Sequence, residues 1–321
     1  MDLSNSSNIS NIDQLSLFML SKQFPAYILN IVLAIMNIIG GTLFLIVKYK
    51  TGDYGTLQHC IINELLSSLW SLVSFANHLK NSVNLVSEVT TPFVCYQWVA
   101  GVIYFGTNTS ILFMFIVSVE RTLSVALPCF YKYSYGNFQR SVCIAAWMIM
   151  ILLFGISFLD KFPTELIPIC LARAAIGHYS FYFYSYFYLI LSVSSSLIYI
   201  VTMIYLKKES AAYNLDHNRS NSNLADIRRK INDKVSLALM FAVFWHTVTN
   251  SVASVATVFI YKLPYRGALI GPYLGAFYYT GAMSFFVCHM IFVEDFRKHL
   301  FWLLFGRKPS NSTVTPIIGS M

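Results

Sequence analysis

Long stretches without a charged side chain recur along this chain of 321 residues. A helix needs roughly 20 apolar residues to cross a hydrocarbon core of about 30 Å. Seven stretches meet this length, and only the second contains an acid, Glu64. The predicted spans are Pro25–Val47, Leu57–Leu79, Phe93–Val119, Ser141–Leu159, Ala174–Leu206, Val235–Tyr261 and Gly267–Val293. The pattern therefore predicts an all-α membrane protein with a seven-transmembrane helix bundle over residues 25–293.

The overall composition agrees with this prediction. Hydrophobic residues make up 56% of the chain and charged residues only 11%, whereas an ordinary soluble domain carries about 25% charged residues. The composition therefore favours membrane spans over the alternative, which is buried core helices of a large soluble protein.

The distribution of lysine and arginine predicts the orientation. With the amino terminus outside, the inner loops and tail hold sixteen of these residues and the outer segments hold six. Cytoplasmic loops carry such an excess, so we expect a multi-pass plasma-membrane protein with residues 1–24 extracellular and residues 306–321 as a cytoplasmic tail. The net charge of +8 then indicates attraction to anionic lipids of the inner leaflet rather than binding to nucleic acid.

The outer segments suggest two covalent modifications. Residues Met1 to Gln14 are polar and lack the apolar core of a cleavable signal. They contain two glycosylation acceptors, Asn5 and Asn8. Of the six cysteines, only Cys95 and Cys170 are placed on the oxidising outer side, so they are the candidate disulfide pair. The alternative is two free outer thiols.

A charged pair closes the third predicted span. Glu120 and Arg121 directly follow the uncharged stretch Phe93–Val119, and Pro128 and Tyr131 come next. This arrangement, with Trp147 beyond it, resembles the rhodopsin-like G-protein-coupled receptors. In that family an acid-Arg-aromatic triplet acts as the switch toward the G protein. The resemblance implies this role for Glu120, Arg121 and Pro128, although Thr122 stands in the aromatic position.

The resemblance extends along most of the chain and has clear departures. Matching positions are Asn37 and Glu64 in the first two spans, the outer pair Cys95 and Cys170, Phe241 and Trp245 in the sixth span, and an amphipathic eighth helix at residues 294–305. Thr247 replaces the proline of the sixth helix, and the run Phe285–His289 replaces the Asn-Pro-x-x-Tyr motif of the seventh. These departures are similar to those of divergent nematode serpentine chemoreceptors, with the Srbc and Srsx branches as candidates.

The resemblance also implies an outer ligand pocket between the third, fifth, sixth and seventh helices. The candidate ligand-binding residues are Ile103, Thr107, Asn108, Tyr182, Tyr186, Trp245, Thr249, Phe277 and Tyr278. Aromatic walls with few polar groups suit a small, largely apolar ligand. Ile103 stands where amine receptors carry an aspartate, which argues against a protonated amine. The seventh span contains no lysine, which excludes a retinal Schiff base.

Glu64 is the one acid within a predicted span, and an unpaired charge there is costly. We expect it to face the bundle interior near Asn37, with Ser67, Ser68 and Asn250 or Ser284 nearby. Two roles remain open for Glu64: an ion- or proton-linked switch, or a protonated, hydrogen-bonded core residue. His178, His246 and His289 lie in separate predicted helices, so we expect structural or pocket histidines, with neither a metal site nor a cofactor.

These observations favour one function over two alternatives. The leading hypothesis is a G-protein-coupled chemoreceptor that binds a small, odorant-like ligand and activates a heterotrimeric G protein. A receptor for a short peptide is the second. A seven-helix transporter or ligand-gated channel is the third, and it requires paired ionisable groups inside the membrane. An enzyme is not expected, because no nucleophile–base pair falls at one depth.

Overall fold

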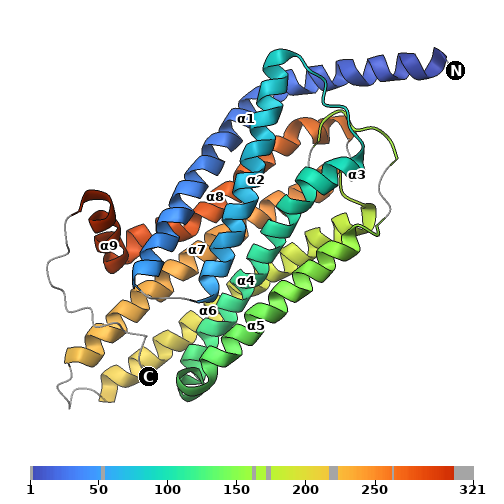
Figure 1. The fold of residues 1–321 in the computed structure, drawn as a ribbon. Helices are drawn as coiled ribbons and strands as arrows, with labels where there is room; N and C mark the ends of the chain where they lie inside the picture. Colours follow the sequence, from blue (N-terminus) through green and yellow to red (C-terminus); the bar gives the residue numbers. More distant parts are fainter. Residues whose placement is uncertain are drawn as a thin grey trace.

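Seven long helices lie side by side in the computed structural model, which describes residues 3–51, 55–160, 164–170, 175–216, 223–261 and 264–306 (Figure 1). They are α1 (Leu3–Thr51), α2 (Thr56–Asn84), α4 (Gly101–Ala126), α5 (Pro128–Ser157), α6 (His178–Asp216), α7 (Asn223–Tyr261) and α8 (Pro264–Phe292). A short helix α3 (Pro92–Cys95) and a π-helical turn η1 (Tyr96–Ala100) lead into α4, and α9 (Glu294–Phe305) follows α8. The prediction of an all-α protein is confirmed for these residues.

Six of the described helical segments are long and apolar enough to cross a membrane. They lie in α1, in α3 to α4, and in α5, α6, α7 and α8. Helix α2, the predicted second span, is not among them. Its buried face carries polar side chains, including Asn63, Glu64, Ser67 and Ser71, which lower its mean hydropathy. A multi-pass membrane protein is thus supported, while the crossing of α2 stays a prediction.

Helix α1 begins much earlier than the predicted first span. It runs from Leu3 and includes Pro25 inside the helix, so the expected boundary at residue 25 falls within one continuous element. Figure 1 shows this first part projecting beyond the ends of the neighbouring helices. It is held to the loop after α2, because the Ser87 hydroxyl donates to Asp13 Oδ1 at 2.7 Å and the Glu88 backbone amide donates to Ser16 Oγ at 3.1 Å.

Several helix ends follow from local sequence. Pro92 and Pro128 lie in the first turns of α3 and α5, where the missing N–H of proline would have no intrahelical partner. The Thr91 side chain accepts a hydrogen bond from the Val94 amide and caps α3. Helix α9 ends at Phe305 and is capped by Gly306, whose φ of 68° lies in the left-handed region that favours glycine.

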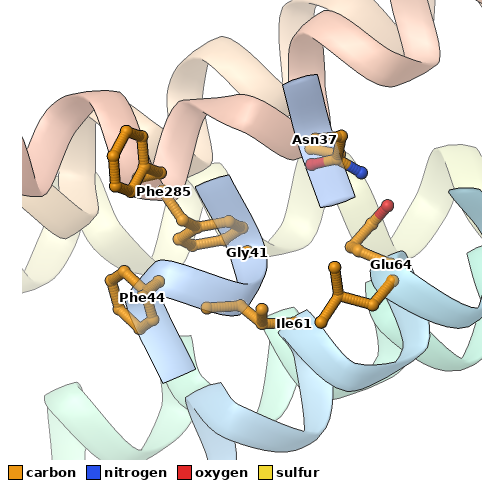
Figure 2. Close-up of a pocket in the computed structure, with 9 residues that line it drawn as sticks. Asn37, Gly41, Phe44, Ile61, Glu64 and Phe285 are labelled. Carbon is orange, nitrogen blue, oxygen red and sulfur yellow. The ribbon is translucent and has the colours of Figure 1, made fainter. Parts of the chain in front are cut away.

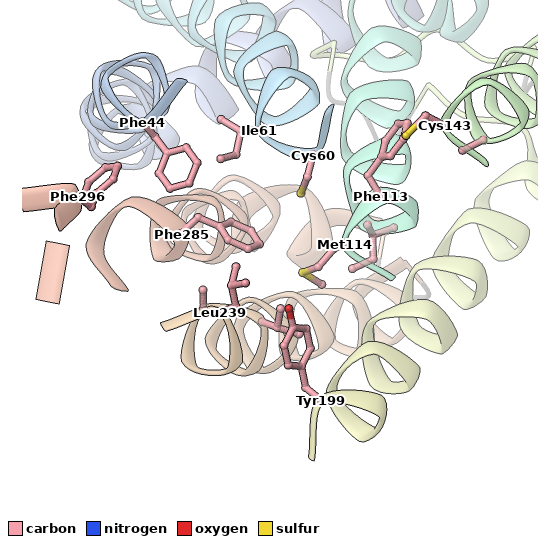
Figure 3. Packing of buried hydrophobic residues seen from close by; sticks show 14 of the residues in the cluster. Phe44, Cys60, Ile61, Phe113, Met114, Cys143, Tyr199, Leu239, Phe285 and Phe296 are labelled. Carbon is pink, nitrogen blue, oxygen red and sulfur yellow. The ribbon is translucent and has the colours of Figure 1, made fainter. Parts of the chain in front are cut away.

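A large apolar cluster fills the bundle toward α9. Phe44 of α1, Phe113 and Met114 of α4, Leu239 of α7 and Phe285 of α8 meet there and are fully or almost fully buried (Figure 3). Lipid tails are as apolar as these side chains, so close packing rather than exclusion from water holds such helices together. Small residues let neighbouring helices pack closely.

Two glycines lie where neighbouring helices approach each other closely. A Cβ at Gly106 of α4 would lie 2.9 Å from Ser67 Cβ of α2, and a Cβ at Gly281 of α8 would lie 2.7 Å from Asn250 Nδ2 of α7. Only a residue without a side chain lets the backbones come this close. These contacts place the polar residues of α2 and α7 in the centre of the bundle.

The predicted disulfide is confirmed. Cys95 at the end of α3 bonds to Cys170, with an S–S distance of 2.01 Å. Beside it, Thr90 and Ile167 form an isolated antiparallel bridge. The loop before α6 is therefore fixed to the start of the α3–η1–α4 segment at two points.

Candidate functional site: a buried polar network between the helices

Glu64 is the centre of a hydrogen-bonded network between three helices. Glu64 is 8% exposed, and its Oε1 atom accepts a hydrogen bond of 2.5 Å from Ser110 Oγ of α4. His246 Nε2 of α7 lies 3.3 Å from the same oxygen. The carboxylate thus has an imidazole partner, which makes it part of an ionisable pair within the bundle.

The expected neighbours of Glu64 are mostly present. Asn37 of α1 and Glu64 extend from facing helices toward the same space (Figure 2), and the Asn37 amide donates to Ser68 Oγ. Asn250 reaches the network indirectly, because its Nδ2 atom lies 3.0 Å from His246 Nδ1. Ser284 instead donates to the Ala242 carbonyl at 3.0 Å and ties α8 to α7.

A small cavity adjoins Glu64 between α1, α2 and α8. Its lining residues are Asn37, Gly41, Phe44, Ile61, Glu64, Leu65, Ala282, Phe285 and Phe286. The cavity has room for about one water molecule. Ligand pockets usually measure about 300–1,000 Å³, so this cavity is too small for the expected ligand.

Thr247 forms a second link from α7. Ser196 Oγ of α6 donates to Thr247 Oγ1 at 2.7 Å, and Thr247 Oγ1 donates to the Ser192 carbonyl at 3.1 Å. Helix α7 is continuous through this position. Where the rhodopsin-like pattern has a proline, which would remove a backbone hydrogen bond, this chain has a side chain that joins α7 to α6.

The structure corrects the expected placement of Trp245. Trp245 is 55% exposed on the outside of the bundle, so it does not line an interior pocket. Neighbouring residues of a helix point about 100° apart, and the inward residue here is His246, which is 1% exposed. Phe241, one turn away, is exposed as well.

The other predicted ligand-binding residues divide by exposure. Tyr186 and Phe277 are exposed, so neither side chain is buried inside the bundle. Those that are buried or half-buried are Ile103, Thr107, Asn108, Tyr182, Thr249 and Tyr278. Contact of any of them with a ligand stays a prediction.

Two of these residues present polar groups inside the bundle. The Asn108 amide donates to the Tyr104 carbonyl at 2.8 Å, while its Oδ1 atom is buried and has no partner among the described residues. Tyr278 OH lies 3.3 Å from Ser254 Oγ, and its ring meets the Tyr188 ring at 6.0 Å. Asn108 Oδ1 is therefore a buried acceptor in the region predicted to hold the ligand.

At the other end of α4, the charged pair is bracketed by neighbouring helices. Glu120 accepts a hydrogen bond from Thr56 of α2, and Thr122 lies 2.7 Å from Thr202 of α6, between their Oγ1 atoms. Arg121 lies between these two links and is half-buried. Within the described parts of the chain, no carboxylate forms an ion pair with its guanidinium. Pro128 begins α5, with its side chain outside the described residues.

Helix α9 packs against the same end of the bundle. Phe296 and Leu300 are buried, and the Phe296 ring lies 5.3 Å from that of Phe44. Phe301 and Phe305 are exposed. A helix thus occupies the predicted residues 294–305, and its position on a membrane surface stays a prediction.

Other predictions fall outside what the structure describes. The side chains of Asn5 and Asn8 are not among the described residues, so their glycosylation is still a prediction. Over the parts that were searched, no group of three or more His, Cys, Asp or Glu side chains is placed to hold a metal ion.

The sequence did not predict the partner of His246. The expectation of a structural or pocket histidine leaves that partner open, and the structure places His246 against Glu64. The available signal was an acid and an imidazole inside separate apolar spans, because such residues usually face the interior and pair with one another. Which of the histidines is the partner depends on helix rotation, which a single sequence does not reveal.

Comparison with known proteins agrees with this architecture. Residues 34–304 match a family model described as serpentine type 7TM GPCR chemoreceptor Srsx. No curated protein is significantly similar to the chain. The match covers α2 to α8 completely, together with most of the predicted first span and nearly all of α9.

Proposed function

Because the chain belongs to the Srsx family of serpentine chemoreceptors of the seven-transmembrane GPCR type, we propose that it binds a small, largely apolar chemical cue and activates a heterotrimeric G protein. The cue binds among the outer halves of α4, α6, α7 and α8, and the G protein binds at the opposite end of the bundle. The receptor lies in the plasma membrane with its amino terminus outside.

The proposal of G-protein coupling rests on the contacts that surround Arg121. Its neighbours Glu120 and Thr122 are engaged by α2 and α6, so Arg121 is held between two helices at the end of α4. A guanidinium offers five hydrogen-bond donors in a planar arrangement. Arg121 is therefore positioned to meet acceptors of a partner that inserts between these helix ends.

The buried side chains near the other end support the ligand class. Asn108 contributes one acceptor without a partner among the described residues, and its amide bonds to the Tyr104 carbonyl. The Tyr104 ring stacks on that of Tyr184, and the Tyr188 ring meets that of Tyr278. A ligand with an apolar body and a single hydrogen-bond donor suits such surroundings, since pockets of this kind combine apolar walls with few polar groups. The ligand can shift the receptor only by its different affinities for two conformations.

The coupling proposal is tested by replacing Arg121. We expect Arg121→Ala to abolish second-messenger responses to a panel of small alcohols, ketones and esters, because the partner loses its charged contact. Surface expression, measured with an amino-terminal epitope on intact cells, should be retained, and the same labelling tests the orientation. Arg140→Ala is the matched control, because Arg140 is exposed on α5. Full signalling by Arg121→Ala contradicts the proposal.

One observation favours a different function. The pair Glu64–His246 places two ionisable groups together inside the bundle, as proton pathways in transporters require. Current recordings from the same cells separate the two functions, since ligand-dependent ion flux without G protein supports a transporter or channel. The receptor is the better supported function, because the family match concerns chemoreceptors.

A further inference from the structure

Two consecutive residues of α7 contact two different helices through polar groups. His246 meets Glu64 of α2 at 3.3 Å, and Thr247 is hydrogen-bonded to Ser196 and Ser192 of α6. Residues that are adjacent in a helix point about 100° apart, so one turn of α7 reaches both neighbours. A displacement of α7 as one continuous helix therefore has to change at least one of these links.

The segment of α2 that contains Glu64 also contacts the charged end of α4. Thr56, Cys60 and Glu64 are spaced four residues apart, so they lie along one face of α2. Thr56 donates to Glu120, and both Cys60 and Glu64 contact Ser110. The Glu64 and Thr56 positions are about 12 Å apart along the helix axis. The partner of His246 and the partner of Glu120 thus belong to one rigid segment.

The His246 ring is also connected to the predicted ligand region. Tyr188 of α6 stacks on it, with ring centroids 6.5 Å apart and an angle of 23° between the planes. Tyr188 in turn meets the ring of Tyr278 edge to face at 6.0 Å. A ligand that moves Tyr278 or Tyr188 therefore acts on the ring that contacts Glu64.

Both nitrogens of His246 have polar partners. Nε2 faces the Glu64 carboxylate, and Nδ1 faces the Asn250 side chain. Asn250 Oδ1 has no partner among the described residues. Rotation of the Asn250 amide by half a turn lets this oxygen accept an N–H from a protonated Nδ1, so that both N–H groups of an imidazolium are satisfied.

We propose that His246 is a positioning residue, and that its pair with Glu64 links α7 to α2 across the interior of the bundle in the resting receptor. Opening of the pair releases α7 and makes the region around Arg121 accessible to the partner. The second part of this inference rests on the proposed function. The first part concerns helix position alone, and it can be measured without a G protein.

The energetics of buried ion pairs supply a test that separates a lock from a structural contact. Removal of one member leaves an unpaired buried charge and is strongly destabilising, whereas replacement of both members by apolar residues is often neutral or stabilising. We therefore compare His246→Leu, the double variant Glu64→Met with His246→Leu, and the parent receptor. Ser118→Ala is the control, because Ser118 is fully buried but bonds only within α4, to the Met114 carbonyl.

The first readout is helix position in purified receptor. Spin labels carried by unnatural amino acids at Arg140 of α5 and Lys234 of α7, both exposed, report the distance between these helices in lipid nanodiscs. We expect the double variant to unfold at a temperature near that of the parent, yet to populate a second distance absent from the parent and from Ser118→Ala. A parent-like distance distribution in the double variant overturns the proposal.

The second readout is basal second-messenger signalling per receptor at the cell surface. We expect an increase of about five-fold or more in the double variant, at the lower end of typical coupling between sites, and no increase in Ser118→Ala. If the distance changes while signalling does not, the lock stands and the proposed coupling to a G protein fails. If signalling rises without a change in distance, the lock between α2 and α7 is refuted.

Discussion

The described part of the chain contains two buried carboxylate–imidazole pairs that differ in what they connect. His78 and Glu88 are 10 residues apart and join the end of α2 to the loop that follows it. Glu64 and His246 are 182 residues apart and join α2 to α7. In both pairs the histidine side chain is nearly inaccessible, with exposures of 3% and 1%.

The surroundings of the His78–Glu88 pair indicate a local contact. Glu88 also accepts a hydrogen bond of 2.8 Å from Asn81, and Ser74 lies 3.2 Å from the second nitrogen of His78. Tyr27 of α1 stacks on the His78 ring at 5.3 Å. Apart from Tyr27, these groups come from α2 and the loop directly after it, so the pair is a local contact.

The comparison shows that chain topology, rather than chemistry, separates a static contact from a candidate switch. A pair within 10 residues closes a short loop at a small entropic cost. A pair between distant helices exists only when the bundle is packed, and it reports their relative position. The following predictions test this distinction, beginning with the largest expected effect.

Replacement of His78 by leucine should cost about 3–5 kcal/mol of stability, because it leaves the buried Glu88 carboxylate without its imidazole partner. We expect a lower unfolding temperature in nanodiscs and reduced surface expression. Basal signalling per surface receptor should be unchanged, in contrast to the double variant at Glu64 and His246. His178→Leu is the control, because His178 is exposed at the start of α6. A rise in basal signalling would show that the His78–Glu88 pair is also a switch.

Replacement of Gly106 by alanine should cost about 1–3 kcal/mol, as overpacking usually does. The added Cβ would lie 2.9 Å from Ser67 Cβ and 3.0 Å from the Asn63 carbonyl oxygen, which forces α2 away from α4 one turn from Glu64. Thermal unfolding measures the loss. Gly155→Ala is the matched control, because nothing lies within 4 Å of its added Cβ. Equal stability of the two variants would mean that α2 adjusts without strain.

Replacement of Lys298 by alanine should leave the unfolding temperature unchanged. Lys298 Nζ lies 3.0 Å from Glu294 Oε1 on α9, but the side chains are 42% and 53% exposed. Exposed ion pairs contribute little, because water and salt screen them. The same thermal assay checks this, and a clear loss would indicate that α9 depends on this contact for its position.

Much of the fold was predictable because hydropathy is a local property. The uncharged stretches predicted the positions of the long helices, and the sidedness of the cysteines predicted the bond between Cys95 and Cys170, which the structure contains. The length of α1 was not predicted, since Leu3–Phe24 is polar enough to suggest a separate segment. Its helix is held by Ser87 and Glu88, which lie far along the chain.

The sequence by itself determined the class of the protein, its helices and the chemistry available in them, including a lone acid in α2 and a histidine in α7. Only the tertiary structure decided that His246 rather than Trp245 faces inward, and that His246 meets Glu64. The physical reason is that helix rotation depends on the polar partners supplied by other helices. Glu64, Ser192 and Ser196 are the partners of His246 and Thr247 on the inward face of α7, and none of them is near α7 in sequence.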